Sequence, residues 1–278
     1  MNPMSTPLEA FNRALGTGEH ELFQGNVDLS KDDMTRLKIR PGQKFQYIDP
    51  SGAEYEFKVV RAKSALTIGQ VVITYAGNAA RNGTAIVAGT TKAHVVGDDT
   101  FDGVANDLVN GFIAIVSGTG LEQLRRIRKN DIAAGASTWD VAEREGMIPG
   151  DTALTAADAY GTLLDATSVY AIWCPWEVTI AAAVTDHVVG CALGTVTDEN
   201  FTVIQTKGPA MIRTVGNTDP LAVGESVVPD AEDGSGKGPT AAGITAAEVD
   251  VVFAISLQVN AAATAAKSLV YLLGNFNP

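Results

Sequence analysis

The feature that most constrains the fold is a series of short segments rich in Val, Ile, Thr and aromatic residues, each bounded by Gly, Asn, Asp or Pro. The segments are 45–49, 55–62, 68–76, 111–117, 122–128, 188–196, 201–206, 210–215, 249–258 and 268–273. β-Branched and aromatic side chains suit a pleated surface, and segments of this length are typical of strands. No segment keeps a helical period for more than about three turns. The pattern predicts a mainly β protein with a β-sandwich or β-barrel-like body and short helical turns.

Several connections have recognisable turn chemistry. Asp49-Pro50-Ser51-Gly52 separates two strand segments, and Pro at the second position with Gly at the fourth predicts a type I turn in a hairpin. The polar, glycine-rich stretch 229–239 predicts an exposed loop. The glycines of 118–120 predict another tight turn between strands.

Two stretches have helix signals. Thr6-Pro7-Leu8-Glu9 has the residues of a capping box with proline at the first helical position, so it predicts a short helix that ends near Gly16. Residues 137–145 begin with Ser137 and an acidic first turn, which indicates a second short helix. We expect an extended N-terminal arm over residues 1–44 and a β-rich body over 45–278. The body is one β domain or two, and in the second case the division falls near 131–165.

Charge is distributed unevenly along the 278 residues, whose formal net charge is −12. Residues 131–278 hold 18 acidic and 5 basic side chains, whereas residues 1–130 hold 14 and 15. This acidity argues against binding to nucleic acid or to an anionic membrane surface. Basic residues concentrate between 31 and 63, where Lys58, Arg61 and Lys63 follow the earlier cations. The candidate docking residues for an acidic partner are Lys31, Arg36, Lys38, Arg40 and Lys44.

Motifs for catalysis, metal binding or cofactor binding are missing from the sequence. The three histidines have no zinc-ligand spacing, and no nucleophile elbow, dinucleotide fingerprint or P-loop is present. Adjacent acids such as Asp198-Glu199 are typical of solvated turns. We therefore expect no enzyme activity, no metal and no cofactor. Cys174 and Cys191 are expected to be reduced, packed thiols, because no export signal or membrane-spanning segment is recognised.

Three longer stretches resemble head-decoration (capsid cement) proteins of tailed bacteriophages. The first is 110–120 followed by 124–130, with a Gly-Thr-Gly turn between two strands. The second is 190–194 leading into Phe201-Thr-Val-Ile-Gln-Thr-Lys-Gly-Pro-Ala210, and the third runs from Val223 to the terminal strand 269–273. The resemblance extends over residues 45–273 and leaves 1–44 uncovered.

The resemblance implies a virion structural protein, made in the host cytoplasm, that sits on the outer surface of the assembled capsid. The implied partners are the major capsid protein and further copies of the chain, as a homotrimer. We expect the basic run of 31–44 to dock on the shell and the acidic second half to face solvent. Two alternatives stay open. One is a major capsid or tail structural protein, and the other is a carbohydrate- or receptor-binding β protein that uses Trp139, Trp173 and Trp176 as a stacking platform.

Overall fold

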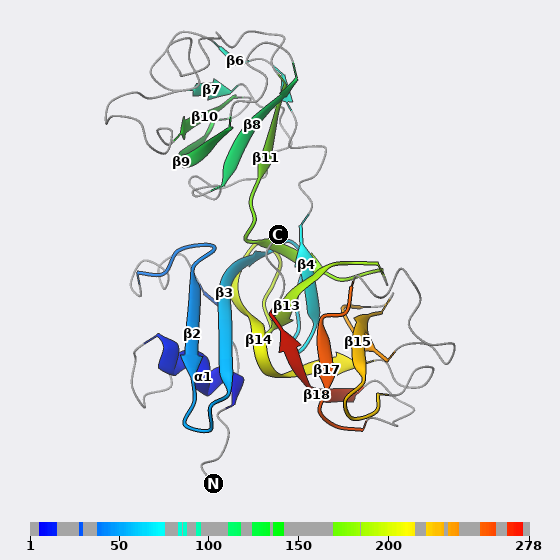
Figure 1. The fold of residues 1–278 in the computed structure, drawn as a ribbon. Helices are drawn as coiled ribbons and strands as arrows, with labels where there is room; N and C mark the ends of the chain where they lie inside the picture. The colour runs from blue at the N-terminus through cyan, green and yellow to red at the C-terminus, as the bar shows by residue number, and fades with distance from the viewer. Residues whose placement is uncertain are drawn as a thin grey trace. The chain divides into compact units, whose positions relative to one another are not determined.

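The fold is mainly β with one short helix among the described residues, as the strand pattern predicted (Figure 1). The computed structural model describes residues 6–15, 28–29, 38–75, 83–84, 86–87, 93–95, 111–117, 124–133, 136–141, 169–183, 185–214, 221–230, 233–238, 251–259 and 266–274. The chain forms two compact units. Unit 1 consists of residues 1–74 and 176–278, and unit 2 consists of residues 75–175.

Unit 2 is an insertion between two neighbouring strands of unit 1. Strand β4 (Val71–Thr74) leads out of unit 1, and β12 (Glu177–Ile180) is the first strand after the return. The two strands pair antiparallel, with Val178 opposite Thr74 and Ile180 opposite Val72. The chain therefore leaves and re-enters unit 1 at adjacent positions, an arrangement that tolerates an inserted domain.

This division replaces the one expected near 131–165. Strand β11 (Val169–Trp173), which follows that region, pairs with β8 (Phe112–Ser117) and β5 (Gly83–Thr84), which precede it. Because these pairings cross the expected boundary, no domain can end there. Long-range strand pairing of this kind leaves no local mark in the sequence.

The sheet of unit 2 has the strand order β5-β11-β8-β9-β10-β7-β6. Its remaining strands are β6 (Ile86–Val87), β7 (Ala93–Val95), β9 (Leu124–Ala133) and β10 (Ala136–Val141). The helix predicted over 137–145 is wrong, since β10 occupies its first half and pairs with both β9 and β7. Pairing on both sides of a strand outweighs a helix-capping signal.

Five strands of unit 1, from both sides of the insertion, form a closed ring. β3 (Glu54–Ala62), β14 (Phe201–Thr214), β13 (Val188–Ala192), β4 and β12 pair in a cycle. Closure leaves no free edge in this ring. Its inward side chains form one buried cluster: Val60, Ala62, Leu66, Val72, Val178, Val189, Ala192, Val196 and Ile204. The predicted barrel-like character of the body is thus confirmed.

A second cycle shares β14 with the first. It runs from β14 through β18 (Ala266–Leu273), β17 (Ala254–Ser256), β15 (Ser226–Pro229) and β16 (Gly236–Lys237) back to β14. Its core also contains Val71 and Cys191 of the first ring. Figure 1 shows β17 and β15 beside β18 in unit 1.

The stretch 229–239, predicted as an exposed loop, instead contributes strand β16. Gly236 pairs with Pro229 and with Thr214 and is buried. A Cβ at Gly236 would lie 2.8 Å from Ile212 Cδ1 and 2.9 Å from Val227 Cγ1. Close packing therefore requires glycine at this position. The polar residues around it in the sequence had instead indicated a loop.

β14 serves both rings because it changes partners along its length. Residues from Phe201 to Lys207 pair with β3, and residues from Lys207 to Thr214 pair with β18. The register shifts between Gln205 and Lys207, and Gly208 has φ +98° with no room for a Cβ against the Glu54 carbonyl. The buried Gln205 amide donates to the carbonyls of Lys207 at 3.0 Å and Pro209 at 2.8 Å. These contacts satisfy carbonyl groups where the strand bends.

The N-terminal segment does not extend from the body as an arm where it is described. Helix α1 (Pro7–Ala14) starts at Thr6, whose hydroxyl accepts the Glu9 N–H at 3.2 Å, as the capping box predicted. Phe11 is fully buried and packs edge-on against Phe45 and Phe57, with ring centroids 5.8 and 5.4 Å away. Strand β1 (Asp28–Leu29) pairs with β14.

Strand β2 (Lys44–Ile48) is the outermost strand of the large sheet and pairs with β3. The predicted hairpin turn joins them, since the Gly52 N–H donates to the Asp49 carbonyl at 2.9 Å. Asp49 Oδ1 also accepts hydrogen bonds from the N–H groups of Ser51 and Ala53. A turn fixed in this way sets the register in which β2 presents its side chains.

Candidate functional site

The candidate site is the basic segment 38–44, which a tight turn holds on the surface of unit 1. Gln43 N–H donates to the Arg40 carbonyl at 3.0 Å, and Arg40 N–H donates to Gln43 Oε1 at 3.0 Å. Pro41 and Gly42 occupy the centre of the turn, and Gly42 has φ +78°. This residue pair is the signature of a type II turn. These two hydrogen bonds within the segment stabilise the turn.

The cations of this segment point outward because its apolar residues are anchored. Lys38 and Arg40 are exposed, whereas Ile39 between them is 5% exposed. A Cβ at Gly42 would lie 3.8 Å from two atoms of the buried Trp176 side chain, so the turn rests on that indole. Gly42 N–H donates to the Val59 carbonyl at 2.9 Å, which ties the turn to β3.

Lys44 begins β2 and adds a third cation at the end of the segment. It is exposed and lies directly opposite Lys58 in the β2–β3 register. Lys58 is half-buried, and this burial together with the nearby Lys44 charge lowers the pKa of Lys58 to about 8. Like charges opposite one another destabilise a strand pair. An anion bound here would relieve that repulsion.

Three of the five candidate docking residues, Lys38, Arg40 and Lys44, are described and exposed. The other two, Lys31 and Arg36, lie outside the described residues. Lys58 was recognised as part of the basic run but not as a docking candidate. Its position opposite Lys44 depends on the hairpin register, which the Asp49–Gly52 turn could have supplied.

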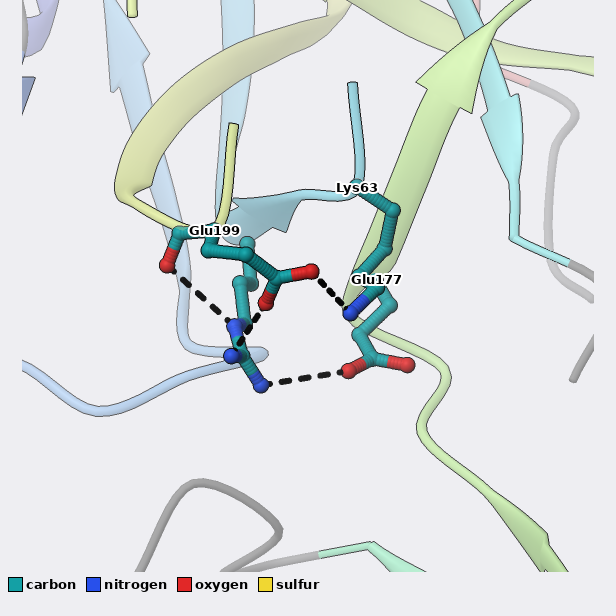
Figure 2. Close-up of polar contacts among 4 residues, drawn as sticks. Lys63, Glu177 and Glu199 are labelled. Atoms are coloured by element: carbon teal, nitrogen blue, oxygen red, sulfur yellow. Dashed lines mark hydrogen bonds and ion pairs between the residues drawn. The ribbon is translucent and has the colours of Figure 1, made fainter. Parts of the chain in front are cut away.

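The last cations of the basic run, Arg61 and Lys63, behave differently because they are neutralised inside unit 1. Arg61 is buried, and its guanidinium lies 3.5 Å from Glu177 Oε1. It also forms an ion pair with the Glu199 carboxylate and donates through Nε to the Glu199 carbonyl at 3.3 Å. Figure 2 shows Lys63 and Glu199 pointing toward one another in the same network, where they form a further ion pair.

This network joins three separate segments of unit 1. Arg61 comes from β3, Glu177 is the first residue of β12, and Glu199 precedes β14. Two cations face two carboxylates, so the cluster is electrically balanced. Glu199 has φ +64°, a strained backbone for a non-glycine residue, yet its carbonyl and carboxylate both contact Arg61. The sequence hypothesis that Asp198-Glu199 is only a solvated turn is wrong for Glu199.

Other candidates from the sequence have less access to ligands. Trp176, one of the proposed stacking residues, is 1% exposed, and the side chains of Trp139 and Trp173 lie outside the described ones. Cys174 and Cys191 are buried and not disulfide-bonded, as expected. Burial raises the pKa of the Cys191 thiol to about 12, which leaves it protonated and unreactive.

Within the described part of the chain, no group of three His, Cys, Asp or Glu side chains is placed to hold a metal ion. No helix described in the structure has the length and apolar character needed to cross a membrane. Comparison with known proteins gave no match to any family model, curated protein or solved structure. The described feature that matches the candidate residues is the basic segment 38–44, with its exposed Lys38, Arg40 and Lys44.

Proposed function

We propose that this chain is a virion structural protein that decorates the outside of an assembled phage head and stabilises it. The proposal starts from the resemblance of 45–273 to head-decoration proteins. In the structure, the second of the resembling stretches forms β14, including the bend at 205–210 that lets one strand join both rings. A stretch whose residues form a bend of this kind supports the resemblance more strongly than an ordinary strand sequence does.

The observation that carries the docking part of the proposal is the anchored exposure of Lys38, Arg40 and Lys44. A protein that binds a preassembled shell gains affinity from a surface already held in its bound shape. Here a hydrogen-bonded turn on Trp176 and a hairpin strand present the three cations. The partner surface is acidic, since charge complementarity governs the rate and specificity of such contacts.

The double-ring body suits the same role. In each ring every strand has two neighbours, so neither ring offers an open edge to unrelated chains. A protein that stabilises a shell under internal pressure needs a fold whose strands do not separate. The shell-binding surface then lies outside the rings, on the 38–44 segment and β2.

Co-sedimentation tests the proposal. The full-length chain is mixed with assembled, undecorated heads of the cognate major capsid protein and centrifuged at low and high salt. We expect saturable binding that weakens as salt rises, because exposed charges are screened. Heads that carry the chain should also withstand higher temperature before releasing their DNA. Absence of the chain from the head pellet at low salt would reject the proposal.

A further inference from the structure

The outer surface of the second ring is apolar on three adjacent strands. Along β14, β18 and β17, alternate residues point into the core, among them Ala210, Ile212, Ala254, Val270 and Leu272. The residues between them point the other way. Those outward residues are Met211, Leu269, Tyr271 and Ile255, and Leu257 follows just beyond β17. We call these five residues the outer apolar face.

Strand register makes this face continuous. Met211 lies opposite Leu269 on β18, and Tyr271 lies opposite Ile255 on β17. Leu257 N–H donates to the Leu269 carbonyl at 2.9 Å, which brings Leu257 alongside the same strand. Figure 1 shows β17 beside β18. The face therefore runs across three hydrogen-bonded strands instead of being a set of scattered side chains.

Three members of the face are substantially exposed: Met211 at 41%, Leu257 at 39% and Ile255 at 36%. Leu269 and Tyr271 are half-buried between them. An antiparallel sheet with one side on the core and the other in water normally alternates apolar and polar residues. Here both sides are apolar, and contiguous exposed apolar surface marks an interaction site.

Charge indicates what occupies the face. Its five residues are uncharged, and the next register pair along β14 and β18 is Arg213 with Lys267. Arg213 also lies 3.7 Å from the exposed Asp233 carboxylate, so Lys267 supplies the net positive charge at this border. Glu225, just before β15, turns its carboxylate back to accept the Ala222 N–H at 2.7 Å. The chain as a whole has a formal charge of −12, so two copies repel one another over most of their surface. They can approach where carboxylates are replaced by apolar side chains with a basic border.

We propose that the outer apolar face is an interface between copies of this chain. Burial of Met211, Ile255 and Leu257 against a second copy removes apolar area from water, and Lys267 at its border faces the acidic surface of that copy. A closed assembly needs a contact surface of this kind on every copy. The face lies on β14, β17 and β18, whereas the proposed shell-docking cations lie on 38–44, so self-association does not depend on the shell.

The test measures mass in solution without any shell. Sedimentation velocity over a concentration series compares the wild-type chain with the double variant Ile255→Asp/Leu257→Asp. The control is Ile48→Asp, which alters an equally apolar and more exposed side chain on β2, at 65%. Circular dichroism shows whether each variant folds. If the double variant does not fold, the single variant Met211→Glu is used in its place.

We expect the wild-type chain and Ile48→Asp to form the same oligomer. The double variant should raise the dissociation constant by about a hundredfold, as loss of central interface residues does. A wild-type chain that keeps the 29.0 kDa monomer mass at every concentration would overturn the proposal. So would a folded double variant, or a folded Met211→Glu, with the wild-type association. Neither result affects the shell-binding proposal, which the head co-sedimentation tests separately.

Discussion

The basic residues of segment 38–44 and those of segment 61–63 show how similar charges acquire opposite roles within one unit. Lys38, Arg40 and Lys44 are exposed and held outward by a turn and a strand. Arg61 is buried and Lys63 is largely covered, and both pair with carboxylates from other segments of unit 1. We call Lys38, Arg40 and Lys44 the outer group, because they are exposed to solvent, and Arg61 and Lys63 the inner group, because they hold segments of the fold together. A count of basic residues along the sequence cannot separate the two groups.

The largest predicted effect comes from breaking the inner group. Arg61→Ala leaves the carboxylate of Glu177, which is 1% exposed, without its guanidinium. Removing one partner of a buried ion pair costs about 4 kcal/mol of unfolding free energy. Urea unfolding followed by tryptophan fluorescence measures this loss. The matched control, Arg40→Ala in the outer group, should change stability by less than about 0.5 kcal/mol.

A double variant sharpens the same comparison. Arg61→Met/Glu177→Met replaces both buried charges by apolar groups of similar length, so it should recover most of the lost stability. Equal stability of Arg61→Ala and the wild-type chain would show that the network in Figure 2 does not stabilise the fold.

The next effect concerns the segment that was expected to be a free arm. Phe11→Ala removes a fully buried ring from its contacts with Phe45 and Phe57 and should cost about 3 kcal/mol. Thermal unfolding of the variant measures the loss. The helix therefore belongs to the folded body, and an N-terminal truncation would confound loss of docking with loss of stability. A Phe11→Ala midpoint equal to that of the wild-type chain would restore the arm hypothesis.

A smaller effect distinguishes Lys58 from its exposed neighbours. Because burial and Lys44 lower the pKa of Lys58 to about 8 from 10.5, the folded state binds this proton less tightly than the unfolded state. The resulting penalty is fully present below pH 8 and is relieved as pH rises from 8 toward 10.5. Lys58→Met should therefore be more stable than the wild-type chain at pH 7, because it lacks this penalty.

Urea titrations at several pH values check this expectation. In that pH range the stability of the wild-type chain should rise relative to the variant, so that the gap between them closes. Lys44→Met, which changes an exposed member of the pair, should give a smaller gain. A constant difference between wild type and Lys58→Met from pH 7 to 10 would mean that Lys58 is not perturbed in the folded chain.

Local signals in the sequence predicted local structure well. The capping box at Thr6–Glu9 and the turn at Asp49–Gly52 appear as predicted, because each depends on hydrogen bonds within a few residues. The mainly β class followed from the repeated strand pattern.

Features that depend on distant parts of the chain were not predictable in the same way. The insertion of 75–175 follows from the pairing of β4 with β12, and the sequence carries no marker at either boundary. Gly236 looked like a loop residue because its neighbours are polar, yet Ile212, Val227 and Phe253 surround it. Burial of Arg61 depends on Glu177 and Glu199, which are more than a hundred residues away in the chain.

The central claim is that the outer group of cations binds an acidic shell surface, and charge reversal tests it most directly. Heads are co-sedimented with wild-type chain, with Lys38→Glu/Arg40→Glu/Lys44→Glu, and with the single variants Arg40→Glu and Lys237→Glu. Lys237 is a partly exposed cation on β16, outside both segment 38–44 and the outer apolar face, and serves as the control. The account predicts that the triple variant folds but loses binding, that Arg40→Glu weakens it, and that Lys237→Glu binds as the wild type does. Equal binding by the triple variant and the wild-type chain would contradict it.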